Sequence, residues 1–479
     1  MSASKSYAAV SMPSFSAIQK GWCWSTFVAF GELHSLLTVL GAKPARLEAR
    51  SSIIAALKKG VKEGLIEIVD CNGSAGKFGT CSKSSTSSRE GLLMIHDETF
   101  WVRIYLSYDV GFSEAYMNGE ISSPSMKDVL NIYVDNYPHL SSVWSLTYKL
   151  KSILDVIIHR FLSHDFRQSI FNVAGYDASN ELYKAFLSQE MQYSCPIWGD
   201  EEGGVRGDLT GRRTYRDLER AQERKIGHIL KKARLRPGHR LLEIGSGWGS
   251  LAIAAAEMGC TVDSLTLSIE QKTLAEERIR KAGFESQIRI HLMDYRNMPP
   301  SFEKAFDACV SLEMLEAVGV EYMPTYIKII DWALKDRNSA VVLSATCYPD
   351  TTFTPYQGDD FIRKYHWPHT IPPSATWLAQ QFHTVLRGRF SLESVEDYAP
   401  HYCRCLREWA RRLEENWTPE LIVSLQERYP EFADAHALNV YKRRWLYMFV
   451  YMEVAYSRVW LTLHTWTFAR PGYSAIECS

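Results

Sequence analysis

From Arg234 onwards, short apolar runs of strand length alternate with longer stretches of helical character. The apolar runs are RLLEI, TVDSLTL, IRIHLMD, FDACVSLE and AVVLSAT, and the helical stretches include SIEQKTLAEERIRKAG and VEYMPTYIKIIDWALK. Strands that alternate with helices in this way are typical of a parallel sheet with helices on both faces. The pattern therefore predicts an α/β fold for this part of the chain.

The N-terminal part of the chain has a different pattern. Apolar residues recur at helical spacing, and a strand-like segment, LIEIVD, follows them. These apolar residues are Ile53, Ile54, Leu57, Val61 and Leu65. Residues 71–90 are rich in Gly, Ser and Lys and are predicted to form a loop or the tip of a hairpin. Residues 92–135 are predicted to form a small unit of helix and strand.

A long amphipathic stretch over residues 141–170 separates these two parts and predicts a helical connector. The length of 479 residues exceeds that of one ordinary domain. We therefore expect an accessory α+β domain over 1–140, the connector, and a larger α/β domain over 171–479.

The composition excludes several classes of protein. The formal net charge is −1, so no overall field attracts nucleic acid, and we expect no nucleic-acid partner. The ten cysteines are scattered without a CxxC pair, which disfavours a zinc site and favours a reducing intracellular compartment. We see neither a signal peptide nor an uncharged run of the ~18–20 residues that a spanning helix needs. We expect a cytoplasmic protein that contacts membranes from one side at most.

The segment LLEIGSGWGS, Leu241–Ser250, carries the most information about chemistry. An apolar strand leads into Gly245, Gly247 and Gly249, and a helix follows. Glycines at such a turn let the backbone approach a ligand at the helix N-terminus. The GxGxG spacing, with Glu243 two positions before the first glycine, fits S-adenosylmethionine better than NAD, since Ser250 replaces the last glycine of GxGxxG. A glycine turn that only packs helix on strand is the alternative.

The next strands offer further candidate ligand contacts. The second strand is expected to bring Thr266 and Leu267 to its carboxyl end, with Gln271 in the following helical turn. An acidic residue for a ribose is missing there. Asp294 and Tyr295 lie where an adenine could bind, although Asp294 could equally cap a helix.

Several further motifs occur in a fixed order: YSCPIW, MDYR, SLEMLEAVG, FIRKYHWP with IPPS, HYCRCLREW and YMEVAYSRVWLTLHTWTF. With the glycine segment, they closely resemble the cyclopropane-fatty-acyl-phospholipid synthase family, which includes the mycolic acid cyclopropane synthases. Upstream, IHDETFWVRI and GFSEAYMNGE resemble the accessory N-terminal domain of the longer members. The chain is thus similar to the long form of this family.

The resemblance implies a Rossmann-like methyltransferase domain that binds S-adenosylmethionine, with a largely helical acyl pocket above it. The residues it implies at the cofactor are Tyr193, Ser194, Glu243, Gly245, Ser246, Gly247, Thr266, Leu267, Gln271, Asp294 and Tyr295. The Thr-Leu-Ser-x-x-Gln arrangement of this family also accounts for the missing acidic residue at the ribose.

The chemistry implied at the acceptor is methyl transfer to an isolated double bond, which leaves a carbocation that must lose a proton. In the family a bound bicarbonate takes this proton. Its cradle maps onto Cys195, Glu316 and Tyr402. Taken singly, each has a structural alternative: a buried filler cysteine, a helix cap and a core tyrosine.

Two positions depart from the family pattern. The bacterial members have His where this chain has Ser344, and Glu-His where it has Glu316-Ala317. Ser344 can donate a hydrogen bond but cannot carry a proton at neutral pH as His does. Bicarbonate binding and ring closure are therefore weaker expectations than methyl transfer, and Ser344 is retained as a catalytic candidate.

The leading hypothesis is cyclopropanation of an unsaturated acyl chain, on a phospholipid. The alternatives are C-methylation of an acyl chain, sphingoid base or terpenoid without ring closure, and a lipid-binding relative that has lost catalysis. Peripheral membrane contact is expected, through residues 141–170 unless these form an internal connector. The sequence leaves a homodimer open.

Overall fold

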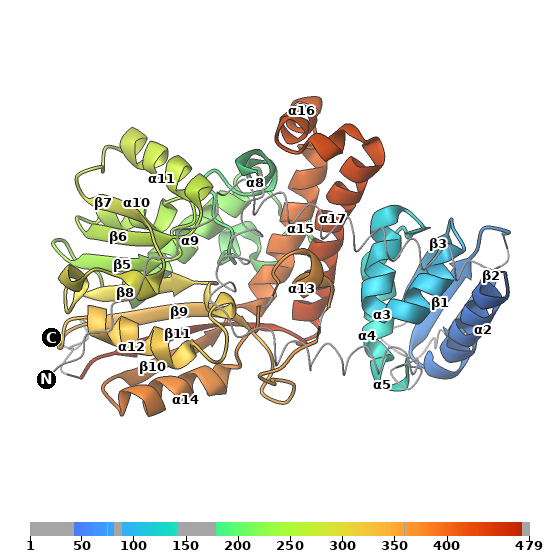
Figure 1. Cartoon of the computed structure of the whole chain (residues 1–479), viewed down its shortest axis with the longest axis horizontal. Coiled ribbons are helices and arrows are strands. Elements are labelled where there is room, and N and C mark those ends of the chain that lie inside the picture. The colour runs from blue at the N-terminus through green and yellow to red at the C-terminus, as the bar shows by residue number, and fades with distance from the viewer. Residues whose placement is uncertain are drawn as a thin grey trace, which may run out of the picture.

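The computed structural model describes residues 43–73, 75–80, 89–140, 179–358, 360–368 and 370–471. Within these ranges the chain forms a four-stranded and a seven-stranded sheet. Figure 1 shows the two sheets at opposite ends of the molecule, with the long helices α15 (Ala399–Glu415) and α17 (Ala435–Ser457) between them. The expected connector over 141–170 lies outside the described residues.

The larger sheet has the strand order β10-β11-β9-β8-β5-β6-β7. Its strands are β5 (Arg240–Ile244), β6 (Thr261–Thr266), β7 (Ile288–Leu292), β8 (Ala308–Leu312), β9 (Ala340–Cys347), β10 (Ser391–Asp397) and β11 (Thr462–Ala469). Strands β5 to β9 pair in parallel, and β11 lies antiparallel between β9 and β10. The five apolar runs predicted as strands are β5 to β9, so the predicted α/β class is confirmed.

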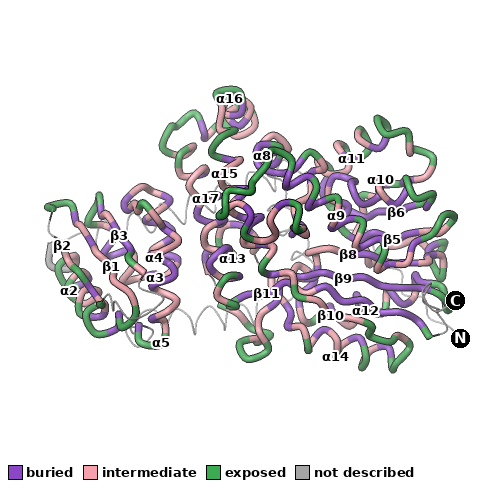
Figure 2. The backbone as a smooth tube through the Cα atoms, turned by 180° about the vertical axis from the view of Figure 1, so that it is seen from behind, coloured by how far each residue is buried: buried purple, intermediate pink, exposed green. Residues whose placement is uncertain are grey.

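Helices cover both faces of this sheet because alternate strand residues point to opposite sides. Leu241 packs on one face with α9, α10 and α11, whereas Leu242 packs on the other with α12 and α14. These helices are α9 (Asp217–Lys232), α10 (Ser250–Glu257), α11 (Ile269–Ala282), α12 (Met323–Ala333) and α14 (Ala375–Leu386). Figure 2 shows the central strands mostly buried between these layers.

The order of the strands fixes the place of a ligand site. From β5 the chain crosses to β6 on one side and later returns to β8 on the other side of β5. In open parallel sheets, ligands bind at the carboxyl ends of the strands where the order reverses in this way. The loops after β5, β6 and β8 are therefore the expected place of a ligand site.

The smaller sheet has the order β2-β1-β3-β4. Its strands are β1 (Gly64–Val69), β2 (Ala75–Thr80), β3 (Glu90–Ile95) and β4 (Ile121–Ser122), and its helices are α2 (Lys43–Gly60), α3 (Thr99–Asn118), α4 (Met126–Asp135) and α5 (Tyr137–Leu140). One prediction was wrong here, since Leu65 belongs to β1 and not to the preceding helix, which ends at Gly60. The predicted hairpin tip is confirmed in part: β1 and β2 pair antiparallel across a short connection after Val69, but the predicted segment also contains the edge strand β2 itself.

The smaller sheet and its helices pack against α17. The Arg443 guanidinium donates to the backbone oxygens of Tyr116 (2.5 Å) and Ile121 (3.0 Å), and it lies 4.1 Å from the centre of the Tyr116 ring. Lys127 forms an ion pair of 2.5 Å with Glu453. A single cluster of buried apolar residues runs from α2 to α15 and α17. The smaller sheet and the helices α15 and α17 therefore share one hydrophobic core.

The remaining described helices are short. They are α8 (Asn180–Phe186), α13 (Phe361–Tyr365), α16 (Pro419–Arg428), η2 (Asp200–Glu202), η3 (Gly204–Arg206), η4 (Tyr295–Asn297), η5 (Pro300–Phe302), η6 (Leu315–Ala317) and η7 (Pro430–Ala433). Within the described ranges, no helix combines the length and the apolar composition needed to cross a bilayer.

Candidate active site

The glycine turn between β5 and α10 has the conformation that its sequence requires. The backbone has φ angles of 102° at Gly245, 49° at Gly247 and 85° at Gly249, in a region that residues other than glycine rarely adopt. A Cβ atom at Gly247 would meet no protein atom within 4 Å, whereas one at Gly249 would lie 3.3 Å from the Ala275 side chain. Gly249 therefore serves helix packing, and Gly247 borders open space.

That open space is a cavity of about 190 Å³ at the carboxyl ends of β5, β6 and β8. All eleven residues predicted to contact the cofactor line it. They are Tyr193, Ser194, Glu243, Gly245, Ser246, Gly247, Thr266, Leu267, Gln271, Asp294 and Tyr295. We call it the polar cavity.

The loop after β6 presents a hydroxyl and an amide to the polar cavity. The Thr266 hydroxyl donates to the Gln271 amide oxygen at 2.8 Å. Ser268 caps α11 by accepting a hydrogen bond from the Gln271 backbone N–H (3.2 Å). Leu267 remains 39% exposed at this edge of the cavity. Neutral groups thus stand where an acidic residue is usual.

Beyond β7, Asp294 and Tyr295 lie at another wall of the polar cavity. Asp294 caps η4 and accepts hydrogen bonds from Arg296 at both carboxylate oxygens, at distances of 2.9 and 2.6 Å. The Tyr295 ring stands edge-on to Tyr326, with ring centres 5.0 Å apart. The carboxylate is thus engaged by Arg296, which leaves the Tyr295 ring as the flat apolar surface on this wall.

Glu243 is a buried residue that lines the polar cavity. Its Oε2 accepts a hydrogen bond from the Ser264 hydroxyl at 2.5 Å, and the two hydroxyls of Ser264 and Ser246 are 2.7 Å apart. Burial raises the pKa of Glu243 to about 8. The carboxyl therefore favours its neutral form near pH 7 unless a cation enters the cavity.

Lys225 of α9 is hydrogen-bonded to the segment over residues 192–194, which lines the polar cavity. Its ammonium donates to Gln192 Oε1 (2.5 Å) and to the Ser194 hydroxyl (2.8 Å). Burial lowers the pKa of Lys225 to about 8, although the charges of Glu313 and Glu243 act in the opposite direction. This lysine was not predicted from the sequence because it lies in α9, well before the glycine segment.

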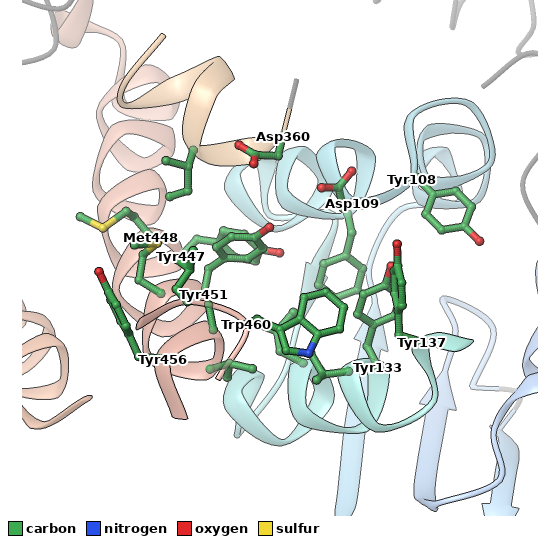
Figure 3. A pocket seen from close by; sticks show the side chains of 18 of the residues that line it. Tyr108, Asp109, Tyr133, Tyr137, Asp360, Tyr447, Met448, Tyr451, Tyr456 and Trp460 are labelled. Carbon is green, nitrogen blue, oxygen red and sulfur yellow. The ribbon is translucent and has the colours of Figure 1, made fainter. Parts of the chain in front are cut away.

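A second, larger cavity of about 620 Å³ lies between the smaller sheet's helices and α17. Its walls are mainly aliphatic and aromatic side chains of α2, α3, α4, α15 and α17. Figure 3 shows Tyr447, Tyr451 and Tyr456 of α17 facing this space, with Tyr133 and Trp460 on another wall. Ligand cavities of this kind usually measure ~300–1,000 Å³ and are mostly apolar. We call it the apolar cavity.

The two cavities meet at four residues that line both. They are Tyr193, Glu313, Met314 and Ala317. The Tyr193 ring stacks on Trp409 with ring centres 5.3 Å apart. A long apolar ligand in one cavity would therefore approach a polar ligand in the other at this junction.

A buried carboxylate, Glu313, stands at the junction. Its Oε1 accepts a hydrogen bond from the backbone N–H of Cys195 (2.8 Å), and its Oε2 accepts one from the Tyr402 hydroxyl (2.6 Å). Burial raises the pKa of Glu313, while these two donors and the charge of Lys225 lower it. Burial and the adjacent carboxylate raise the pKa of Tyr402 well above its usual range, so this phenol remains a donor.

A second carboxyl, Glu316, faces the apolar cavity. Its Oε1 accepts a hydrogen bond from the Thr346 backbone N–H (2.6 Å), and its buried Oε2 has no hydrogen-bond partner among the described residues. Burial raises the pKa of Glu316 to about 8, and the negative charge of Glu313 adds to the rise. Glu316 is therefore mostly neutral at pH 7.

Three of the four predicted catalytic residues meet at this place. Tyr402 and Glu316 line the apolar cavity, and Cys195 contacts Glu313 through its backbone N–H. Burial raises the pKa of the Cys195 thiol well above its usual range, so the thiol is not a nucleophile.

Ser344, the fourth predicted residue, lies apart from the other three. Its hydroxyl accepts a hydrogen bond from Thr465 of β11 (3.3 Å), and the residue lines neither cavity. Two positions later on β9, Thr346 reaches the apolar cavity and shares a hydrogen bond of 2.8 Å with the Tyr456 hydroxyl.

Glu313 itself was missed, although the sequence contained a signal for it. It directly follows β8, one of the two strands at which the order reverses. Polar residues at the carboxyl ends of such strands are candidates for function. The acidic residue at the end of FDACVSLE could have been selected on that ground.

The comparisons with known proteins were made on the whole chain. The profile of the mycolic acid cyclopropane synthetase family matches residues 165–440. A tuberculostearic acid methyltransferase of Mycobacterium tuberculosis is 31% identical over 371 residues, which are 76% of this chain and 79% of that protein. A cyclopropane-fatty-acyl-phospholipid synthase of Escherichia coli is 29% identical over 70% of this chain and 80% of its own length.

Among solved structures, the cyclopropane synthase MmaA2 of Mycobacterium tuberculosis superposes with a TM-score of 0.51 at 22% identity. The superposition covers 63% of this chain and 98% of that one. At that identity the likeness concerns the fold.

Proposed function

The chain belongs to the mycolic acid cyclopropane synthetase family, and on that premise we propose that it methylates a carbon–carbon double bond in an unsaturated acyl chain of a phospholipid and closes a cyclopropane ring. The observation that carries this proposal is the junction between the two cavities. A long apolar cavity that opens onto a small polar one suits a lipid chain and a separate methyl donor.

The methyl donor is S-adenosylmethionine, which supplies a methyl carbon bound to a positively charged sulfur. The residues of the polar cavity fit it. Gly247 leaves open space for close approach of the ligand, Thr266 and Gln271 offer uncharged groups to a ribose, and the Tyr295 ring offers a flat surface to an adenine. Lys225 keeps Ser194 in place over the cavity through its hydrogen bond.

The apolar cavity supplies what a weak nucleophile needs. An isolated alkene reacts only when it is held close to the methyl carbon and shielded from water. Tyr402 and Tyr456 stack with their ring centres 4.7 Å apart and present aromatic faces beside the junction. Such faces stabilise a developing cation, as does the ionised carboxylate of Glu313.

A second candidate is methyl transfer without ring closure, which yields a methyl-branched alkene when a chain carbon loses the proton, or a methylene acyl chain when a 1,2-hydride shift comes before loss of a methyl proton. Two observations favour it. Ser344 and Ala317 replace histidines of the cyclopropane-forming pattern, and the 31% identical relative is named a tuberculostearic acid methyltransferase. The two candidates share methyl transfer and differ in how the cation is quenched.

Because the proposed substrate is a phospholipid, we also propose contact with the membrane surface. The stretch over 141–170 that was expected to make this contact lies outside the described residues. Binding of the full-length chain to phospholipid vesicles in a co-sedimentation assay tests this part of the proposal. Equal recovery of the chain with and without vesicles would contradict it.

Product analysis separates the two candidates. The chain is incubated with S-adenosylmethionine and vesicles of a mono-unsaturated phospholipid, with a saturated phospholipid as control, and the acyl chains are analysed by proton NMR. Ring protons upfield of the chain methylenes support cyclopropanation. A methyl-branch signal, or exocyclic methylene protons that the substrate lacks, supports the second candidate, and an unmodified lipid contradicts both.

A further inference from the structure

The sequence resemblance implied a cradle for a bicarbonate base, formed by Cys195, Glu316 and Tyr402. In this chain two of those groups already have an acceptor. The Cys195 backbone N–H and the Tyr402 hydroxyl both donate to Glu313, one to each carboxylate oxygen, at 2.8 and 2.6 Å. We infer that the Glu313 carboxylate takes the place of bicarbonate and is the base that removes the proton from the lipid cation, an inference that rests on the proposed function.

The position of Glu313 meets the first requirement for a base, which is access to both reactants. It lines the polar and the apolar cavity at once. Any cation formed where the two cavities meet therefore forms beside this carboxylate. A general base must be within hydrogen-bonding reach of the proton that it takes.

The backbone at Glu313 is a second, independent sign of function. Its φ angle is 51°, in the left-handed region that favours glycine. The surrounding structure holds it there, since its backbone N–H donates to the Ser344 carbonyl oxygen at 2.7 Å. Strained residues of this kind cluster at active sites, where they aim a functional side chain.

The surroundings of Glu313 act on its proton affinity in both directions. Burial raises the pKa of Glu313, which makes it a stronger base, whereas the two hydrogen-bond donors and the Lys225 ammonium lower that pKa and favour the ionised form. The nearby Glu316 is mostly neutral at pH 7, because burial and the charge of Glu313 raise its pKa to about 8. The two hydrogen-bond donors at the junction thus bind Glu313 and not Glu316.

Bicarbonate itself does not fit these residues. The two donors that would orient it are occupied by Glu313. The Ser344 hydroxyl, at the position of the missing histidine, is hydrogen-bonded to Thr465 and lines neither cavity. Ala317 offers no polar side chain at the junction. The replacement of both histidines and the presence of Glu313 thus agree with a single change, in which Glu313 takes the place of bicarbonate as the base.

The proton step balances with groups of the chain. The two π electrons of the double bond form the new carbon–carbon bond to the methyl carbon, while the electrons of the carbon–sulfur bond leave with sulfur. The resulting carbocation then loses a proton to a Glu313 oxygen. The electron pair of that C–H bond closes the ring when the proton comes from the new methyl group, and forms a double bond when it comes from a chain carbon. Glu313 returns its proton to water after the product leaves.

The first test uses the wild-type chain, S-adenosylmethionine and mono-unsaturated phospholipid vesicles in carbonate-free buffer under argon. We expect the initial rate to stay unchanged when bicarbonate is added. A wild-type rate that falls severalfold without bicarbonate and recovers with it would overturn the inference and leave the proposed function intact. A wild-type chain that methylates no lipid would overturn the proposed function and, with it, this inference.

The second test compares two variants of Glu313. Glu313→Gln keeps the shape but cannot accept the proton, and we expect a loss of ~10²–10⁴-fold in rate that bicarbonate does not restore. Glu313→Gly relieves the left-handed backbone and opens the cradle beside Cys195 and Tyr402. We expect a similar loss that added bicarbonate or formate partly restores, in a saturable manner.

The controls separate a missing base from a damaged fold. Calorimetry should show that both variants bind S-adenosylmethionine with the wild-type affinity. Glu303→Gln, at an exposed glutamate that lines neither cavity, should retain the wild-type rate. Wild-type turnover by Glu313→Gln would overturn the inference, as would a Glu313→Gly variant that binds the cofactor normally but ignores both added anions.

Discussion

Removing the hydroxyl of Tyr402 tests how the carboxylate at the junction is tuned. The phenol donates to Glu313 Oε2 at 2.6 Å, and its ring stacks on Tyr456. Tyr402→Phe removes the donor and keeps the ring. A hydrogen bond to a buried charged group contributes about 1.5–3 kcal/mol, so its loss lowers the ionised fraction of Glu313 and should slow turnover roughly 10- to 150-fold at a pH below the pKa of that carboxyl.

The same change should also shift the pH profile in a defined direction. A base works when it is ionised, so the rate rises with pH through its pKa. Loss of a donor to the carboxylate raises that pKa, and the rising limb should move upward by about one to two pH units. Initial rates with methyl-labelled S-adenosylmethionine between pH 5 and 9, together with calorimetric cofactor affinity, measure both effects.

A matched control lies one helical turn earlier. The Tyr398 hydroxyl bonds to His228 (2.9 Å) and Glu396 (3.3 Å), and the residue lines neither cavity. Tyr398→Phe should leave the rate and the pH profile unchanged. Equal losses in the two variants would refute the reasoning, as would a Tyr402→Phe variant whose profile superimposes on that of the wild type.

Further predictions concern the cofactor, the second carboxyl and the contact between the two parts of the chain. Gly247→Val should abolish S-adenosylmethionine binding in calorimetry, because a side chain would enter the polar cavity from a backbone with φ of 49°; unchanged affinity in the folded variant would remove the glycine turn from the site. The pKa of Glu316 is raised to about 8, so Glu316→Gln should have nearly the wild-type rate at pH 7. As the pH rises through about 8, only the wild type should gain rate from ionisation of this carboxyl. A large loss of rate in Glu316→Gln at pH 7 would show that the charged form acts there. Arg443→Ala removes one hydrogen bond to α3, one to β4 and a ring contact to α3, and it should lower the free energy of unfolding by about 2–4 kcal/mol in urea, whereas Arg280→Ala, which removes an exposed side chain, should not.

The elements that the sequence predicted best are those with strong local patterns. Strands β5 to β9 are short apolar runs bounded by helices, and the turn after β5 needs glycines for its positive φ angles. The residues expected after β5, β6 and β7 therefore line one cavity, because the carboxyl ends of parallel strands meet at one edge of a sheet. Tyr193 and Ser194 lie before this sheet in the chain and were predicted only from the resemblance to the family.

The acceptor side was less predictable because it depends on contacts between distant segments. The apolar cavity is built from α3, α4 and α17, and no local pattern shows that these helices face one another. Ser344 was selected because it corresponds to a histidine of the family pattern, but its hydroxyl bonds to Thr465 and the residue lines neither cavity. Strand β2 was hidden by its glycines and its weakly apolar sequence, and only pairing with β1 forms it.

The central claim is that this chain transfers a methyl carbon to a lipid double bond, and a deuterium experiment tests it most directly. The full-length chain is incubated with S-adenosylmethionine carrying a trideuterated methyl group and with vesicles of unsaturated or saturated phosphatidylglycerol, and the intact lipids are fragmented in a mass spectrometer. The account predicts deuterium in the acyl chains of the unsaturated lipid alone, with two deuterons kept when the new methyl group loses the proton and three when a chain carbon does. Deuterium on the head group, equal labelling of the saturated lipid, or no labelled lipid at all would contradict it.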